Sequence, residues 1–291
     1  MIVLDGKKTA IALKEEIKLT VDKRINDGKK IPHLAAVLVG NDGASLTYVG
    51  SKVRSCEQIG IKSTLIHLDE TISENELLQK ITQLNNDDSL DGYIVQLPLP
   101  EHINEEKILL AIDPRKDVDG FHPSNFGRMA LEMNSFIPAT PYGIMELLKR
   151  YKIETSGKHC VVIGRSHIVG RPISILMSQK GPYGNATVTV AHSRTENIKV
   201  LTRSADIIVS ALGIPEFLKA DMVKEDVVII DVGITRVPDT SHPKGYLIKG
   251  DVAYEEVARK AYAITPVPGG VGPMTIAMLL KNTLLACERR D

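Results

Sequence analysis

Short apolar runs with the length of buried strands alternate with amphipathic helix patterns along most of this chain, and this alternation limits its fold more than any other feature. A helical pattern over about residues 8–26 precedes the apolar run HLAAVLVG. Further helices are expected over about 44–58 and after the capping box Ser73-x-x-Glu76, and further strands at STLIHLD and GYIVQLPLP. Such alternation predicts a mostly parallel sheet covered by helices, with ligands bound at the carboxyl ends of its strands.

The pattern breaks between about Ile112 and Gly143, where Pro and Gly are frequent, and a second alternating series follows. Its strands are expected at CVVIG, ATVTVAH, ADIIVSA and VVIIDVG, with a helix from about Gly170 and a last helix from about Pro273. This series is typical of a Rossmann-like domain, so the sequence predicts two α/β lobes with a cleft between them. The expected domains are residues 1–119, joined by the C-terminal helix 273–291, and residues 120–272.

The composition limits the class of partner. The 291 residues are 43% hydrophobic, enough for a sizeable core, and 36 Lys and Arg balance 36 Asp and Glu. Without a net charge, neither nucleic acid nor a membrane surface is expected as a partner. Three scattered cysteines, Cys56, Cys160 and Cys287, indicate a reducing compartment. The sequence shows no signal peptide and no metal-ligand spacing among its eight histidines, so we expect a cytoplasmic protein without a metal site.

A glycine-bearing turn follows the strand HCVVIG. The pattern Gly164-x-Ser166-x-x-x-Gly170 leads into a helix, where backbone N–H groups and the helix dipole can bind a pyrophosphate. The spacing departs from GxGxxG, and a turn of this kind also occurs as a plain tight connection.

The end of the next strand indicates which dinucleotide is bound. A NAD site carries an acid there for the ribose hydroxyls, whereas this chain has His192, Ser193 and Arg194. A hydroxyl flanked by cations suits a 2′-phosphate, and Arg165 can add a guanidinium. The sequence therefore favours NADP over NAD, although Arg194 taken alone can equally be a surface cation.

A polar row marks the expected helix over about 44–58. Ser45, Tyr48 and Lys52 are spaced by three and four residues, so they share one helix face and can converge on one ligand. The alternative is a surface helix whose Tyr and Lys face water. A Tyr-x-x-x-Lys pair also occurs in short-chain dehydrogenases, but there it follows the nucleotide site, and here it precedes it.

Two further residues are expected at the same cleft. Gln96 lies at the carboxyl end of GYIVQLPLP, where two prolines stop the strand. Asp119, in KDVDGF, lies in the interlobe loop, where its carboxylate can pair with the N–H donors of an amino-pyrimidine. Asp119 and Asp117 can also be simple turn-forming residues.

Together these segments resemble the methylenetetrahydrofolate dehydrogenase/cyclohydrolase family across essentially the whole chain. The resemblance is carried, in order, by SLTYVGSKVRSCEQIGI, DGYIVQLPLP, DPRKDVDGFHPSNFGRM, PATPYG, VVIGRSHIVGRP and PVPGGVGPMT. It implies that the first lobe is catalytic and that the second binds NADP.

The resemblance also implies roles for individual residues. Lys52 corresponds to the acid–base residue of the cyclohydrolase step, and Tyr48, Gln96 and Ser45 correspond to residues around the reacting carbon. Asp119 corresponds to the residue that holds the pterin ring. Pro268, Gly269 and Gly270 correspond to a loop that contributes to folate binding. The residues that correspond to dinucleotide contacts are Gly164, Arg165, Ser166, Ser193 and Ile234.

The implied activity has two steps on a folate substrate, and the implied assembly is a homodimer through the nucleotide lobe. NADP would oxidise 5,10-methylenetetrahydrofolate to the 5,10-methenyl compound, which water would then open to 10-formyltetrahydrofolate, within one-carbon metabolism that feeds purine biosynthesis. The hydride step mainly needs positioning, whereas the addition of water needs a base such as neutral Lys52.

Two other readings account for less of the sequence. An oxidoreductase similar to shikimate dehydrogenase also places a catalytic Lys and Asp ahead of an NADP lobe, but it leaves the PGGVGP loop and Tyr48 unexplained. A dinucleotide sensor without catalytic activity would not require Lys52, Gln96 and Asp119 to fit one chemistry.

Overall fold

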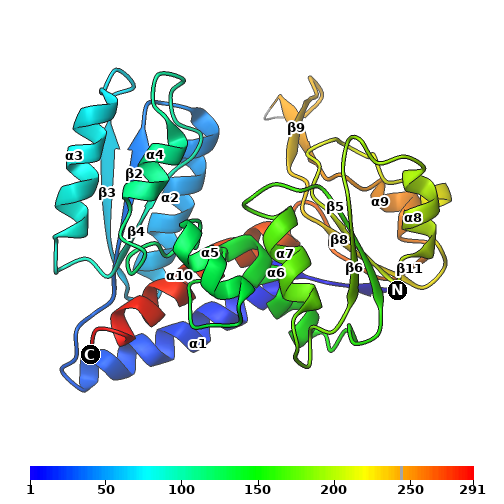
Figure 1. Cartoon of the computed structure of the whole chain (residues 1–291), viewed down its shortest axis with the longest axis horizontal. Helices are drawn as coiled ribbons and strands as arrows, with labels where there is room; N and C mark the ends of the chain where they lie inside the picture. The colour runs from blue at the N-terminus through cyan, green and yellow to red at the C-terminus, as the bar shows by residue number, and fades with distance from the viewer. Residues whose placement is uncertain (243–244) are drawn as a thin grey trace. The chain divides into compact units, whose positions relative to one another are not determined.

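The computed structural model describes residues 1–242 and 245–291, and its contacts divide the chain into two compact units (Figure 1). Unit 1 comprises Met1–Ala10 and Thr140–Thr275, and unit 2 comprises Ile11–Ala139 and Ile276–Asp291. Each unit contains its own parallel sheet. The predicted α/β fold class with two domains is therefore confirmed.

The sheet of unit 2 has three parallel strands in the order β3-β2-β4. They are β2 (His33–Val39), β3 (Lys62–Leu68) and β4 (Gly92–Val95). Every residue of β2 and β4 is buried, as expected of strands that read as continuous apolar runs. Because β3 and β4 flank β2 on opposite sides, the connections diverge at the carboxyl ends of these strands, where α/β sheets bind ligands.

Several helices belong wholly or partly to unit 2. They are α1 (Gly6–Asn26), α2 (Gly43–Gln58), α3 (Glu74–Asn85), α4 (Glu105–Ala111), α5 (Pro123–Ala130) and α10 (Val271–Glu288), of which α1 and α10 extend across the division between the units. The capping box predicted at Ser73 and Glu76 is present at the start of α3 and is therefore confirmed. Asp42 caps α2 by accepting a hydrogen bond from the N–H of Ser45.

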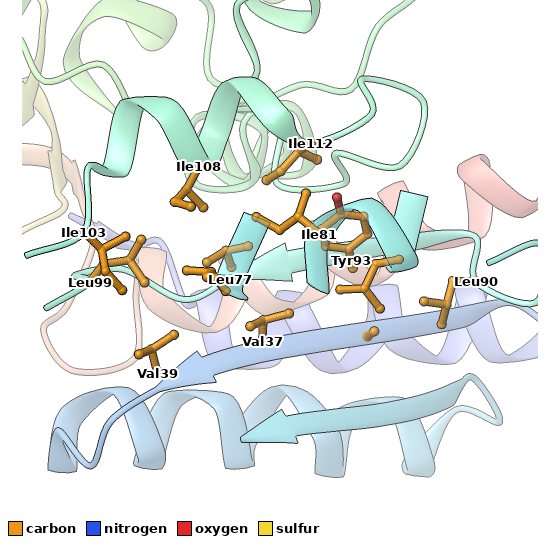
Figure 2. Close-up of a cluster of buried hydrophobic side chains, with 13 residues drawn as sticks. Val37, Val39, Leu77, Ile81, Leu90, Tyr93, Leu99, Ile103, Ile108 and Ile112 are labelled. Carbon is orange, nitrogen blue, oxygen red and sulfur yellow. The ribbon is translucent and has the colours of Figure 1, made fainter. Parts of the chain in front are cut away.

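One buried cluster joins α3 and α4 to a face of the sheet. Figure 2 shows Ile108 of α4 and Ile112, directly after this helix, beside Leu77 and Ile81 of α3, above the side chain of Val37 on β2. Four of these five residues are fully buried, and Ile112 nearly so. This packing fixes the position of β4 and of the segment that follows it, where the candidate site begins.

The sheet of unit 1 has six strands in the order β1-β11-β8-β7-β5-β6, and every neighbouring pair is parallel. The strands are β1 (Ile2–Val3), β5 (His159–Ile163), β6 (Thr187–Ala191), β7 (Ile207–Ser210), β8 (Val227–Asp231) and β11 (Ala261–Ile264). The order reverses between β5 and β7, because β6 lies on the other side of β5. The predicted Rossmann-like arrangement places a dinucleotide at this switch point.

The remaining elements of unit 1 connect these strands. The helices are α6 (Ala139–Arg150), α7 (Gly170–Ser178), α8 (Ile198–Ser204), α9 (Tyr254–Val257) and the 3₁₀ helix η1 (Ala220–Met222), and an antiparallel pair is formed by β9 (Thr235–Pro238) and β10 (Tyr246–Lys249).

The division by contacts differs from the boundary expected at residue 119. Residues 120–139 belong to unit 2 by their contacts, and within this unit Asn282 on α10 donates hydrogen bonds to the carbonyls of Val118 and Ile137. Residues 1–10 belong to unit 1, because β1 pairs with β11. The Pro- and Gly-rich break also contains regular structure, since α5 lies within it and α6 begins at Ala139.

Candidate active site

Lys52 and Gln96 meet at the carboxyl end of the sheet of unit 2. The Lys52 Nζ donates a hydrogen bond of 3.2 Å to the Gln96 Oε1. The same Nζ lies 4.4 Å from the centroid of the Tyr48 ring, one helical turn earlier on α2. An ammonium over an aromatic face is attracted by the ring quadrupole. The structure therefore brings Gln96, which the sequence selected at a strand end, to the Tyr48 and Lys52 pair that it selected on one helix face.

The amide of Gln96 has a defined orientation. Gln96 follows β4 directly, and its backbone N–H donates to the carbonyl of Val37 on β2. Its side-chain Nε2 donates to the carbonyl of Leu97 over 2.7 Å. Because the amide nitrogen is used in this way, the amide oxygen faces Lys52 as an acceptor.

Lys52 is a buried base. Only 4% of its surface is exposed, and burial lowers the pKa of its amine because the ammonium loses hydration. The negative charge of Asp119 opposes this effect and raises the pKa of Lys52. Burial in turn raises the pKa of Asp119, while Lys52 lowers it. Asp119 thus lies close enough to influence the protonation of Lys52 directly.

The loop that carries Asp119 is held by neighbouring polar residues. The carboxylate of Asp117 accepts hydrogen bonds from the backbone N–H groups of Phe121 and His122 and from the side-chain amide of Asn125. Lys116 donates to carbonyls at the end of α3. The sequence predicted for Asp117 either a turn-forming role or a functional role weaker than that of Asp119, and it did not indicate Asn125.

Ser45 is buried in the first turn of α2, seven residues before Lys52 on the same helix. Its spacing from Tyr48 and Lys52 is the helical spacing that the sequence predicted.

A pocket of about 680 Å³ opens beyond the carboxyl ends of the same strands, lined by Val39, Gly40, Asn41, Asp42, Glu70, Thr71, Pro98, Leu99, Pro100 and His102. Neither Lys52 nor Asp119 lines it. We place the candidate active site at Lys52 because the buried base and its partners lie there.

The glycine turn after β5 in unit 1 is very tight. Gly164 has a φ of +120°, and a Cβ on Gly170 would lie 2.3 Å from the carbonyl oxygen of Gly164. A residue larger than glycine therefore does not fit at position 164 or 170 unless the backbone shifts. The Oγ of Ser166 accepts hydrogen bonds from the N–H groups of Val169 and Gly170 at the start of α7.

The other predicted dinucleotide contacts also lie in unit 1 at the carboxyl end of its sheet. Arg165, Ser193 and Arg194 are exposed, and Ile234, just after β8, is 61% exposed. The turn after β6 is closed by a hydrogen bond from the N–H of His192 to the Thr195 Oγ1.

The segment Pro268–Gly270 lies in unit 1, beside the start of α1. The N–H of Lys7 donates to the carbonyl of Gly269, and a Cβ on Gly6 would overlap the carbonyl of Gly270. This loop therefore requires glycine on both sides of the contact.

Comparison with known proteins identifies the family. The catalytic-domain model of tetrahydrofolate dehydrogenase/cyclohydrolase matches residues 4–119, and the model of its NAD(P)-binding domain matches residues 138–291. The chain belongs to the tetrahydrofolate dehydrogenase/cyclohydrolase family. The bifunctional protein FolD of Flavobacterium johnsoniae is 72% identical over 100% of this chain and 99% of its own length. The corresponding FolD protein of Flavobacterium psychrophilum is 67% identical, with 100% and 99% covered.

Solved structures of the family have the same fold. The bifunctional FolD enzyme of Campylobacter jejuni is 49% identical, covers 100% of both chains and superposes with a TM-score of 0.94. The Trypanosoma brucei methylenetetrahydrofolate dehydrogenase-cyclohydrolase, solved with NADP and an inhibitor, is 36% identical, with 100% of this chain and 98% of that chain covered and a TM-score of 0.94. Shikimate dehydrogenase of Thermus thermophilus, at 15% identity and a TM-score of 0.52 over 88% of this chain and 99% of that one, shares the fold alone.

No helix within residues 1–242 and 245–291 is long and apolar enough to cross a bilayer. No group of three or more His, Cys, Asp or Glu side chains in the same residues is arranged to hold a metal ion.

Proposed function

We propose that this chain oxidises 5,10-methylenetetrahydrofolate with NADP and hydrolyses the resulting 5,10-methenyltetrahydrofolate to 10-formyltetrahydrofolate. The observation that carries the proposal is the buried Lys52, whose amine contacts Gln96 and Tyr48 and is influenced by Asp119. Within this family, that arrangement supplies a base for the addition of water.

Lys52 acts as the general base of the hydrolytic step. Water must lose a proton as it attacks the methenyl carbon, and a neutral amine can accept that proton. Burial favours the neutral form of Lys52, and the cationic methenyl substrate would favour it further. When the ring opens, the amine can return this proton to the folate nitrogen, while the hydroxyl of the intermediate loses its proton to solvent as the formyl C=O forms.

Gln96, Tyr48 and Ser45 orient the reacting groups. The Gln96 Oε1 holds the Lys52 amine, so that its lone pair is directed when the amine is neutral. The Tyr48 ring borders the same amine and presents a flat surface to the substrate. Ser45 lies on the same face of α2, close to the substrate carbon.

Asp119 and the loop Pro268–Gly270 bind the folate. The carboxylate of Asp119 can accept two N–H donors from the amino-pyrimidine edge of the pterin, which fixes the ring relative to Lys52. The segment Pro268–Gly270, with its glycines packed against the start of α1, offers backbone groups to the same substrate.

The residues of unit 1 fit NADP. The turn from Gly164 to Gly170 lacks side chains where a pyrophosphate must approach the backbone, and α7 begins directly after it. Ser166 accepts its two hydrogen bonds through oxygen, which leaves its proton for a phosphate. Arg165 and Ser193 would hold the 2′-phosphate, and Ile234 would contact the nicotinamide side. Bound NADP supplies the acceptor for the hydride that leaves the methylene carbon.

We also propose a homodimer formed through unit 1. Strand β6 is an edge strand of the sheet, and Val190 on it is 39% exposed. Val200, on the helix α8 that follows β6 in the chain, is 67% exposed. An edge strand with exposed apolar residues is suited to pair with a second copy. Light scattering should give a dimer mass for the wild type and a monomer mass for Val190→Lys; a monomeric wild type would contradict the proposal.

Residues 1–119 with the C-terminal helix 273–291 would carry the folate chemistry, and residues 120–272 would bind the nucleotide. The proposed location is cytoplasmic, where the product would serve one-carbon metabolism and purine biosynthesis.

Two assays of the purified chain test the proposed activity. In the first, 5,10-methylenetetrahydrofolate is supplied with NADP or NAD, and reduced nicotinamide is measured. In the second, loss of the methenyl chromophore is followed without nucleotide, against a blank without protein. We expect activity in both assays and a higher kcat/KM with NADP than with NAD. Absence of both activities would contradict the folate assignment, and a preference for NAD would contradict the cofactor assignment alone.

A further inference from the structure

A fully buried carboxylate lies at the carboxyl end of the sheet of unit 1, apart from the residues considered above. Asp251 has no exposed surface. Its Oδ2 accepts a hydrogen bond of 2.6 Å from the N–H of Leu212, and its Oδ1 accepts one of 2.9 Å from the N–H of Ile214. The Ser210 Oγ lies 3.4 Å from the same Oδ2 as a weaker donor. Asp251 therefore fixes the backbone of the loop that follows β7.

That loop borders both sides of the proposed dinucleotide site. A Cβ on Gly164 would lie 2.3 Å from the carbonyl oxygen of Ala211, so the glycine turn and the loop are in direct contact. On its other side, the Thr235 Oγ1 is 3.4 Å from the carbonyl oxygen of Gly213. Residues 211–214 thus lie between the glycine turn and the segment that carries Ile234.

Asp251 also packs against the segment that carries Ile234. A Cβ on Gly233 would lie 2.3 Å from the Asp251 Oδ1, so this position accepts only glycine while the carboxylate keeps its place. One carboxylate therefore sets the spacing between the loop after β7 and the loop after β8.

The backbone of Asp251 is itself held in place. The carboxylate of Asp231, at the end of β8, accepts hydrogen bonds from the N–H groups of Asp251, Val252 and Gly233. Each of these bonds is between 2.9 and 3.0 Å. The position of Asp251 is therefore determined before any ligand arrives.

The loop after β7 and the loop after β8, which Asp251 holds at a fixed separation, each carry an exposed isoleucine. Ile214 is 50% exposed and Ile234 is 61% exposed, although both follow buried strands. Exposed apolar side chains beside a ligand site are suited to contact a flat ring. A buried carboxylate must accept hydrogen bonds to offset its lost hydration, and Asp251 accepts them from the backbone N–H groups of Leu212 and Ile214, which fixes the geometry of this loop.

We propose that Asp251 is a positioning residue for the dinucleotide, which holds residues 211–214 and Gly233 so that Ile214 and Ile234 border the nicotinamide ring. This inference rests on the proposed binding of NADP. Asp251 itself touches neither the cofactor nor the folate.

The test compares two aspartates of the same sheet. Asp251→Asn replaces one acceptor oxygen by an NH₂ group that faces a backbone N–H. The matched control, Asp206→Asn, changes a carboxylate that accepts a backbone hydrogen bond from His159 at the opposite, amino end of the sheet. For each protein we would measure the dissociation constant for NADP by calorimetry, the KM for NADP, the cyclohydrolase rate without nucleotide and the melting temperature.

We expect Asp251→Asn to weaken NADP binding about tenfold and to raise the KM for NADP by a similar factor, because a charge-assisted hydrogen bond is lost. The cyclohydrolase rate should stay within about twofold of the wild type, since its proposed base lies in unit 2. Asp206→Asn should lower the melting temperature without a change in NADP binding. The proposal is overturned if Asp251→Asn binds NADP like the wild type, or if both activities decline together. Failure of the wild type to bind NADP would instead refute the proposed function.

A measurement on the wild type does not depend on the folding of a variant. Hydrogen exchange of the Leu212 and Ile214 amides should be slow in the protein without nucleotide, because both donate to a buried acceptor. Rapid exchange of these amides, slowed only when NADP is added, would overturn the claim that Asp251 arranges the loop in advance.

Discussion

The amine of Lys52 donates to the amide oxygen of Gln96 over 3.2 Å, although 44 positions separate the two residues in the sequence. One lies on a helix and the other directly after a strand. The contact fixes the direction of the Lys52 amine, and burial disfavours its charge. These two effects make Lys52 suitable as a base near neutral pH.

The charge of Asp119 should govern the pH dependence of the hydrolytic step. Asp119 raises the pKa of Lys52, so Asp119→Asn should lower that pKa further and increase the neutral fraction of Lys52 at a given pH. The rising limb of kcat against pH, measured at saturating methenyl substrate, should therefore move to lower pH. The control Asp69→Asn removes an exposed carboxylate after β3 and should leave the profile unchanged. A shift of the limb to higher pH in Asp119→Asn would contradict the account.

Burial of Lys52 should also make stability depend on pH. The pKa of Lys52 is lower in the folded state than the 10.5 of the unfolded chain. Between the folded-state and unfolded-state pKa values the unfolded chain binds more protons, so the free energy of unfolding rises with pH up to about 10.5. Lys52→Met should lack this rise and should be more stable than the wild type near neutral pH. Denaturant midpoints across this range measure the difference. Lys23→Met, at an exposed position of α1, should follow the wild type, and a Lys52→Met variant less stable than the wild type at neutral pH would contradict the prediction.

The preference for NADP should depend on cations beside the glycine turn. Arg165→Ala should lower kcat/KM for NADP about tenfold, because a charged contact to the 2′-phosphate is lost, while kcat/KM for NAD stays within about twofold. Lys180→Ala removes an exposed cation beyond the far end of α7 and serves as the control. Equal losses with both nucleotides would show that Arg165 does not read the 2′-phosphate.

The buried face of α4 should contribute much more to stability than its exposed face. Ile108 is fully buried in the cluster of Figure 2, so Ile108→Ala should lower the free energy of unfolding by about 2–5 kcal/mol. Leu110, two residues later on the same helix, is 50% exposed, and Leu110→Ala should cost less than about 1 kcal/mol. Urea unfolding measures both values. Equal losses would mean that α4 does not pack as described.

Local patterns were sufficient to predict most of the fold. The buried strands β2, β5, β7 and β8 were predicted from apolar runs, and the start of α3 was predicted from its capping box. The grouping of Tyr48 with Lys52 follows from helical spacing, and Gln96 was predicted from its place at a strand end. These features depend on neighbours in the sequence, which is why the sequence alone reveals them.

Contacts between distant segments were not predictable. Strand β1 is only two residues long and pairs with β11, near the other end of the chain. Asn282 on α10 donates hydrogen bonds to the carbonyls of Val118 and Ile137. By its contacts the segment 120–139 belongs to unit 2, although the sequence predicted a boundary at residue 119. Asp251 contacts the loop after β7 and the loop after β8, and no spacing in the sequence indicates this. These contacts join residues far apart in the sequence, so local patterns do not indicate them.

The most direct test of the two-step account follows both products of one reaction in the wild type and in Lys52→Met. With 5,10-methylenetetrahydrofolate and NADP, the wild type should form NADPH with little methenyl compound, because Lys52 promotes its hydrolysis. Lys52→Met should still form NADPH, but methenyl compound should accumulate in nearly equal amount, with the hydrolytic rate reduced at least about a hundredfold. A Lys52→Met enzyme that forms NADPH without methenyl accumulation would contradict the assignment of Lys52 as the base.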